Sequence, residues 1–214
     1  MKNPKTIFKL TVIKYWDEKP KYPDFEVHKH TISYFSSLIK AEQAILKYIK
    51  DKYGKIFGFK INEYVLDEYS YWETPKSWRT YLSDGSLWDE SIEPSMWYEN
   101  GKPYKEYFAG RPAEKIRFKV GDLVEVLNDD DTVTLEIVEK FPWTTEFVQQ
   151  FHERCRKDGL DTPVRINHTY DFYDTIDKNG EDSHSRAIDV FPARLKVSSK
   201  LRDKLNFAYA NAEK

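Results

Sequence analysis

Two histidines in the C-terminal half of the sequence are candidates for metal binding or for acid–base chemistry. His168 and His184 lie at the outer ends of a predicted hairpin, where they could be cross-strand neighbours. Imidazole and carboxylate groups together suit several divalent metals, and such a cluster could serve a metal-dependent hydrolase. The nearby aspartates are Asp171, Asp174, Asp182 and Asp189. The spacing of these histidines and aspartates matches no recognised metal motif, and we therefore predict no cofactor. His168 and His184 remain candidate metal ligands only.

Other catalytic signatures are missing from the sequence. It contains no G-x-S-x-G elbow, no P-loop and no G-x-G-x-x-G motif. Cys155 follows Val148 and Phe151 on one predicted helix face, which indicates a buried and inert thiol. His28 and His30 share a face of a predicted strand but match no ligand spacing. The sequence therefore favours a non-enzymatic protein, although an active site assembled only by folding stays open.

Aromatic residues concentrate in the middle of the chain and are the main candidates for binding. Four of the six tryptophans lie there, and Trp78 and Trp88 flank an Asp84-Gly85 turn, so they are assigned to hairpin packing. The remaining rings lie in loop-like sequence rich in Pro, Glu and Lys, where exposed rings can anchor a protein partner. The predicted binding residues are Trp72, Trp97, Tyr98, Tyr104 and Tyr107. We expect an interaction protein that uses this aromatic-rich loop surface or a cleft between two lobes.

Composition narrows the choice of partner and location. The formal net charge of −2 over 214 residues provides no chain-wide basic field for duplex DNA. A single-stranded nucleic-acid binder that uses Lys115, Arg117 and Lys119 stays open as an alternative. The single cysteine suits a reducing compartment, and the first sixteen residues carry a charge every few positions, unlike a signal peptide or membrane anchor. We therefore expect a cytoplasmic protein without a membrane segment.

Hydrophobic periodicity supplies the elements that must position these residues. Strands are predicted at 6–15, 25–34 and 55–68, and a helix capped by Ser36 or Ser37 buries Leu38, Ala41, Ile45, Tyr48 and Ile49. A hairpin follows at 78–91, and strands are predicted at 116–127, 132–140, 168–176 and 184–191. A second helix carries Cys155 and ends near Gly159, and a third begins at Ser198 or Ser199.

These elements predict an α+β fold with two antiparallel-sheet lobes, each with a packed helix. The predicted domains are 1–110, with the aromatic-rich hairpin, and 111–214, joined near Gly101–Pro112. The second lobe would open with an SH3-like barrel-type hairpin at Val120-Gly121-Asp122-Leu123-Val124-Glu125-Val126, where Gly121 allows a tight bend.

Short motifs after about Lys55 carry a broader resemblance. They are Trp78 with Asp84-Gly85-Ser86-Leu87-Trp88-Asp89, Ile116-Arg117-Phe118 with Val120-Gly121-Asp122, and Tyr173 with His184 and Val190-Phe191-Pro192. In these motifs the chain resembles an uncharacterised family of bacterial cytosolic proteins associated with gut anaerobes. The resemblance implies a bacterial cytosolic origin and no activity, cofactor or catalytic residue.

Overall fold

The chain divides into two compact units. The computed structural model describes residues 6–51, 54–66, 75, 77–92, 98–99, 102–103, 116–140, 150, 153–159 and 172–212. Unit 1 comprises Met1–Ser95 with Leu127–Val133, and unit 2 comprises Met96–Val126 with Thr134–Lys214. The domains at 1–110 and 111–214 stay a prediction, and most of the predicted link at Gly101–Pro112 lies outside the described residues.

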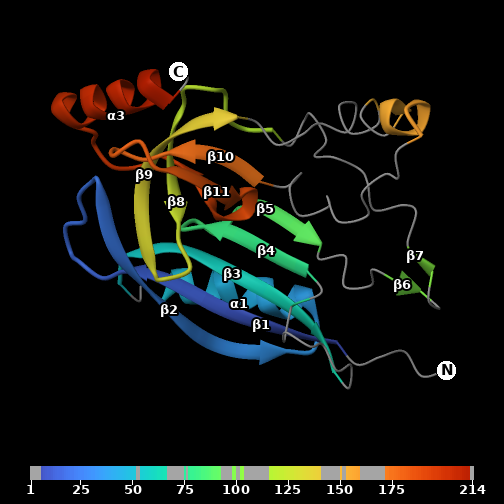
Figure 1. Ribbon diagram of the computed structural model, residues 1–214. Helices are drawn as coiled ribbons and strands as arrows, with labels where there is room; N and C mark the ends of the chain where they lie inside the picture. Colours follow the sequence, from blue (N-terminus) through green and yellow to red (C-terminus); the bar gives the residue numbers. More distant parts are fainter. Residues whose placement is uncertain are drawn as a thin grey trace. The chain divides into compact units, whose positions relative to one another are not determined.

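Unit 1 is an antiparallel sheet with a helix on one face. Its elements are β1 (Thr6–Tyr15), β2 (Asp24–Phe35), α1 (Leu38–Lys50), β3 (Ile56–Val65), β4 (Ser77–Leu82) and β5 (Leu87–Ile92). The strands follow the order β2-β1-β3-β4-β5, and each neighbouring pair is antiparallel. In Figure 1, α1 lies behind the strands of this sheet.

The core of unit 1 confirms the predicted helix. Ser37 is its N-cap, and the Ser37 side chain accepts a hydrogen bond from the backbone N–H of Lys40. Ala41 and Ile45 are fully buried against the sheet. The residues of this core are Leu10, Val12, Ala41, Ile45, Phe59, Ile61 and Tyr81. The buried stripe is therefore the one that the helical spacing predicts, with strand residues of both β1 and β3 beneath it.

The β4–β5 hairpin packs against α1 through its turn. Asp84 accepts hydrogen bonds from the N–H and the hydroxyl of Ser86, at 2.9 and 2.6 Å, and these bonds lower the pKa of the Asp84 carboxyl. Gly85 has φ +84°, and a Cβ placed there would lie 3.0 Å from the Ile49 side chain. Trp78 is buried, in agreement with its assignment to hairpin packing, whereas Leu87 at the start of β5 is 49% exposed. Gly85 thus meets two requirements at once: a left-handed backbone and close contact with a helix.

The remaining elements belong to unit 2, except that the end of β8 and the start of β9 lie in unit 1. These elements are β6 (Tyr98–Glu99), β7 (Lys102–Pro103), β8 (Leu123–Leu127), β9 (Thr132–Lys140), β10 (Phe172–Ile176), β11 (Asp182–Arg186), the 3₁₀ helix η3 (Ala187–Asp189), β12 (Val190–Pro192) and α3 (Ser199–Ala212). Residues 153–157 are also helical, and Cys155 is buried there as predicted. The strand predicted at 184–191 is wrong, because η3 interrupts it and β12 then pairs with β8.

The predicted fold class, α+β with two separate antiparallel-sheet lobes, is wrong. The protein is mostly antiparallel β. Ten of the described strands form one sheet, in the order β11-β10-β9-β2-β1-β3-β4-β5 with β8 bonded to β9 and β12, while β6 and β7 pair with each other in a separate sheet. Within unit 1, the turn before β9 bonds to β2: the Val27 N–H donates to the carbonyl of Asp131 at 2.8 Å, and Lys29 Nζ lies 2.6 Å from Asp131 Oδ1. This turn continues the first sheet, so the expected SH3-like opening of an independent lobe is also wrong.

The packing of Gly85 on α1 has a measurable consequence. Gly85→Ala should destabilise unit 1 by about 1–2 kcal/mol for the left-handed backbone and by roughly 1 kcal/mol more for crowding against Ile49. Gly54→Ala is the matched control, because Gly54 has φ +79° and, among the described residues, no atom lies within 4 Å of the position that a Cβ would take. Urea denaturation measures both, and an equal loss in the two variants would contradict the packing role.

Candidate functional site

The predicted aromatic binding residues lie almost entirely outside the described part of the chain. Trp72, Trp97, Tyr104 and Tyr107 are among the residues that the structure leaves undescribed. Tyr98 lies in β6, where its backbone is in register with Pro103 of β7. The aromatic-rich surface therefore stays a prediction.

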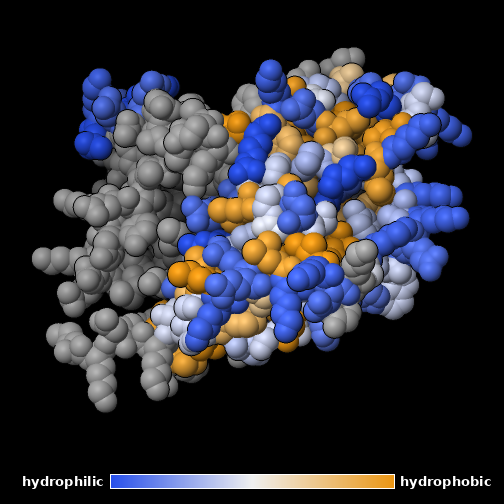
Figure 2. All heavy atoms as spheres, turned by 180° about the vertical axis from the view of Figure 1, so that it is seen from behind, coloured by the Kyte–Doolittle hydropathy of each residue, from blue (hydrophilic) through white to orange (hydrophobic). Residues whose placement is uncertain are grey.

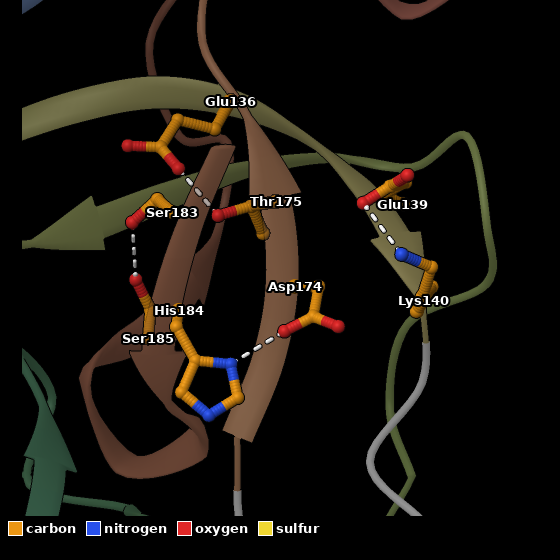
Figure 3. Close-up of polar contacts among 8 residues, drawn as sticks. All are labelled: Glu136, Glu139, Lys140, Asp174, Thr175, Ser183, His184 and Ser185. Atoms are coloured by element: carbon orange, nitrogen blue, oxygen red, sulfur yellow. Dashed lines mark hydrogen bonds and ion pairs between the residues drawn. The ribbon is translucent and has the colours of Figure 1, made fainter. Parts of the chain in front are cut away.

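His184 is paired with an aspartate across the β10–β11 hairpin. Asp174 and His184 are partners in register, and His184 Nδ1 lies 2.5 Å from Asp174 Oδ1 (Figure 3). His168 lies outside the described residues, so its predicted position near His184 stays a prediction. A carboxylate on one imidazole nitrogen sets the ring orientation and tautomer, as in many general bases and metal ligands.

The serines beside His184 belong to the other face of β11. Because side chains alternate along a strand, Ser183 and Ser185 point away from the face that carries His184. Their hydroxyl oxygens lie 3.1 Å apart, and Figure 3 shows them turned from the imidazole. This hairpin therefore does not assemble a Ser-His-Asp triad from neighbouring strand residues. Within the described ranges, no group of three or more His, Cys, Asp or Glu side chains could hold a metal ion.

A buried carboxyl group lies on β9, next to this hairpin. Glu136 is only 3% exposed, and its carboxylate accepts a hydrogen bond from the Thr134 hydroxyl at 2.5 Å. It accepts a second from the hydroxyl of the fully buried Thr175, which Figure 3 shows. Burial raises the pKa of Glu136 above its usual value, and the charge of Asp177 adds to the effect, while the two hydroxyl donors oppose it. Sequence alternation predicts that Glu136 faces solvent, so the pattern missed this group.

A second buried carboxylate is neutralised by an arginine. Glu125 in β8 is fully buried, and Arg194 Nη2 and Nε lie 2.6 and 2.8 Å from its Oε2. The backbone N–H of Arg194 donates to Glu125 Oε1 at 3.0 Å, and the guanidinium lies 5.2 Å from the centre of the Phe191 ring. Charge pairing, hydrogen bonds and ring contact together make this a structural ion pair.

The alternative nucleic-acid site is only partly described. Arg117 and Lys119 are exposed on either side of the buried Phe118, in a segment that precedes β8 and is not itself a strand, and Lys115 lies outside the described residues. The Arg117 N–H donates to the Tyr173 hydroxyl at 3.2 Å, which ties this segment to β10. The segment presents two cations, and their role stays a prediction.

Unit 1 carries large apolar side chains on its surface. Ile39 and Leu46 of α1 are 66% and 60% exposed, although a helix of this kind usually buries its aliphatic residues. Glu42 lies between them in the sequence and accepts a hydrogen bond from the Tyr81 hydroxyl at 2.8 Å, so these exposed residues lie at the edge of α1 next to β4. Burial and the Glu42 carboxylate raise the pKa of Tyr81 well above its usual value. Leu87 pairs in register with Tyr81 and completes what we call the α1–β5 surface: Ile39, Leu46 and Leu87.

Comparison with protein-family models, with curated proteins and with solved structures finds no match for this chain. In the described residues, no helix is long and apolar enough to cross a membrane.

The raised pKa of Glu136 predicts a specific pH dependence of stability. The folded state holds the Glu136 proton more tightly than the unfolded state, whose carboxyl has a pKa near 4.5. Wild-type protein should therefore lose stability relative to Glu136→Gln as the pH rises above about 4.5, because the buried group must ionise. The difference in Tm between the two proteins, followed from pH 4 to 8, measures this.

Glu181→Gln is the control for this pH series, since Glu181 lies exposed in the turn before β11. A Tm difference that stays constant with pH for Glu136→Gln would show that the carboxyl does not titrate as its burial requires.

Proposed function

We propose that this chain is a non-enzymatic interaction protein that binds a partner protein through the α1–β5 surface. The observation that supports the proposal is the exposure of Ile39, Leu46 and Leu87 on one side of unit 1. Exposed aliphatic side chains on a helix and an adjacent strand favour association, because their burial against a partner releases water from apolar surface. Figure 2, which views the molecule from behind Figure 1 and so from the side of α1, has apolar residues between the charged ones.

The predicted aromatic residues are close to this surface in the sequence. Ser77, where β4 begins, is in register with Ile92, where β5 ends. Trp72 precedes Ser77 by five residues and Trp97 follows Ile92 by five. The proposal therefore keeps Trp72, Trp97, Tyr98, Tyr104 and Tyr107 as candidates that extend the contact. It also includes the cytoplasmic location, which the single cysteine supports, and membership of the bacterial family that the motifs resemble.

Removing the apolar character of the surface should abolish the interaction. Purified protein with Leu46→Asp and Leu87→Asp should retain a captured partner at least about tenfold less than wild type, since each leucine contributes about 1.5–3 kcal/mol when buried. Quantitative affinity capture from an extract of the source organism measures this. Lys40→Asp with Lys47→Asp changes two exposed positions of the same helix and is the control.

Circular dichroism and Tm must first establish that all variants are folded. A partner that the leucine variant and the lysine variant retain equally would contradict the α1–β5 surface as the binding site.

A metal-dependent hydrolase is the second candidate, and the contact between Asp174 and His184 supports it. Zn²⁺ binding, measured by calorimetry, should weaken at least about tenfold in His184→Ala and stay unchanged in His30→Ala, which removes an exposed histidine from β2. Absence of Zn²⁺ binding by the wild type, or equal binding by both variants, would remove this candidate.

A further inference from the structure

An open groove lies in unit 2 between α3 and the turn that joins β10 to β11. It has a volume of about 550 Å³ and is lined by Lys178, Ser199, Lys200, Asp203, Lys204 and Phe207. Lys178 belongs to the turn, and the other five belong to α3. Figure 1 shows this turn next to the helix. The groove is separate from the residues of the α1–β5 surface, all of which belong to unit 1.

The charge of the groove is opposite to that of the chain. Its lining contains three lysines and one aspartate, whereas the whole protein has a formal net charge of −2. Lys200 and Lys204 are four residues apart, so they project from one side of α3 one turn apart. Lys178 adds a third cation from the turn. This arrangement attracts a ligand that carries two or three negative charges close together.

Phe207 gives the groove an apolar end. Its side chain is 74% exposed, the highest fraction among the large apolar side chains of the described residues. Leu205 and Ala208 are the α3 residues buried against the rest of unit 2, so Phe207 is not needed to hold the helix in place. Phe207 follows Lys200 and Lys204 at the seven- and three-residue spacings of one helix face. A ligand that contacts the two lysines can therefore also cover the ring.

We propose that this groove binds a short acidic segment of a partner protein, with Asp or Glu side chains on Lys178, Lys200 and Lys204 and an apolar side chain on Phe207. Carboxylates separated by one or two residues match the spacing of the lysines, and an aliphatic or aromatic residue between them reaches the ring. Asp203 limits the number of anions that the groove accepts, which favours a peptide over a denser polyanion.

Single-stranded nucleic acid fits the same residues less well. Its binding depends on many phosphate contacts and on several stacking rings along a track. The groove offers three cations, one aspartate and one ring, on a chain with net negative charge. The acidic peptide therefore uses every feature of the groove, whereas a nucleic acid would use only part of it.

Fluorescence anisotropy with a labelled DEFDELD peptide tests the proposal on the full chain at low salt. Lys200→Glu with Lys204→Glu should weaken binding at least about tenfold, and Phe207→Ala about threefold or more. Lys200→Gln with Lys204→Gln provides a milder variant that removes charge without reversing it and should show an intermediate loss. Arg202→Glu is the matched control, because Arg202 is exposed on α3 but does not line the groove, and it should change affinity less than about twofold.

Three results would overturn the proposal. The first is the absence of peptide binding by wild-type protein at low salt. The second is an equal loss of affinity in Arg202→Glu and in the lysine variants, which would indicate general electrostatic attraction. The third is tighter binding of a labelled oligothymidylate than of the peptide, which would assign the groove to nucleic acid. Loss of peptide binding with unchanged capture through the α1–β5 surface separates this site from the proposed function.

Discussion

The ion pair between Glu125 and Arg194 is the interaction on which much of unit 2 depends. A carboxylate with no exposed surface in the middle of β8 would cost several kcal/mol without a partner. Arg194 supplies that partner through its guanidinium and its backbone N–H. Because Arg194 follows β12 by two residues, the same contacts hold β12 beside β8 and set the direction of the chain toward α3. The position of the α3 groove therefore depends on the buried charge of Glu125 in β8, which does not line the groove.

Local structure was predictable where a single residue type determines the backbone. Asp84-Gly85 forms the predicted turn between two strands, and Asn179-Gly180 forms another of the same kind, since Gly85 and Gly180 both have φ +84°. The buried stripe of α1 was predictable for a similar reason, because helical spacing alone decides which side chains share a face. The assembly of the strands into one sheet was not predictable, since β2 and β9 are neighbours in the sheet but distant in the sequence, and the local pattern carries no signal for contacts such as the Val27 N–H bond to the Asp131 carbonyl.

The buried carboxylates of the candidate sites were also missed, because their burial depends on contacts between distant parts of the chain. Glu125 and Glu136 lie in alternating β sequence, where a charged residue normally indicates the solvent side of a strand. Both are nevertheless buried, and each is satisfied by a partner from a distant position in the chain: Arg194 for Glu125 and Thr175 for Glu136. The local pattern cannot reveal such partners. Ile39 and Leu46 did carry a signal: they fall outside the buried stripe of α1, on a side that the spacing leaves polar. Large aliphatic residues on the polar side of an amphipathic helix are therefore the pattern that could have identified the α1–β5 surface.

The two proposed surfaces differ in how they would respond to solution conditions. The α1–β5 surface consists of aliphatic side chains, and burial of apolar area is little affected by moderate salt. The α3 groove attracts anions through three lysines around one ring, and this attraction weakens as salt is added, because salt shortens the Debye length. A partner with both an apolar face and an acidic segment would therefore make one contact that weakens as salt is added and one that changes little. Occupancy of the α3 groove would then vary with ionic strength, while occupancy of the α1–β5 surface would stay nearly constant.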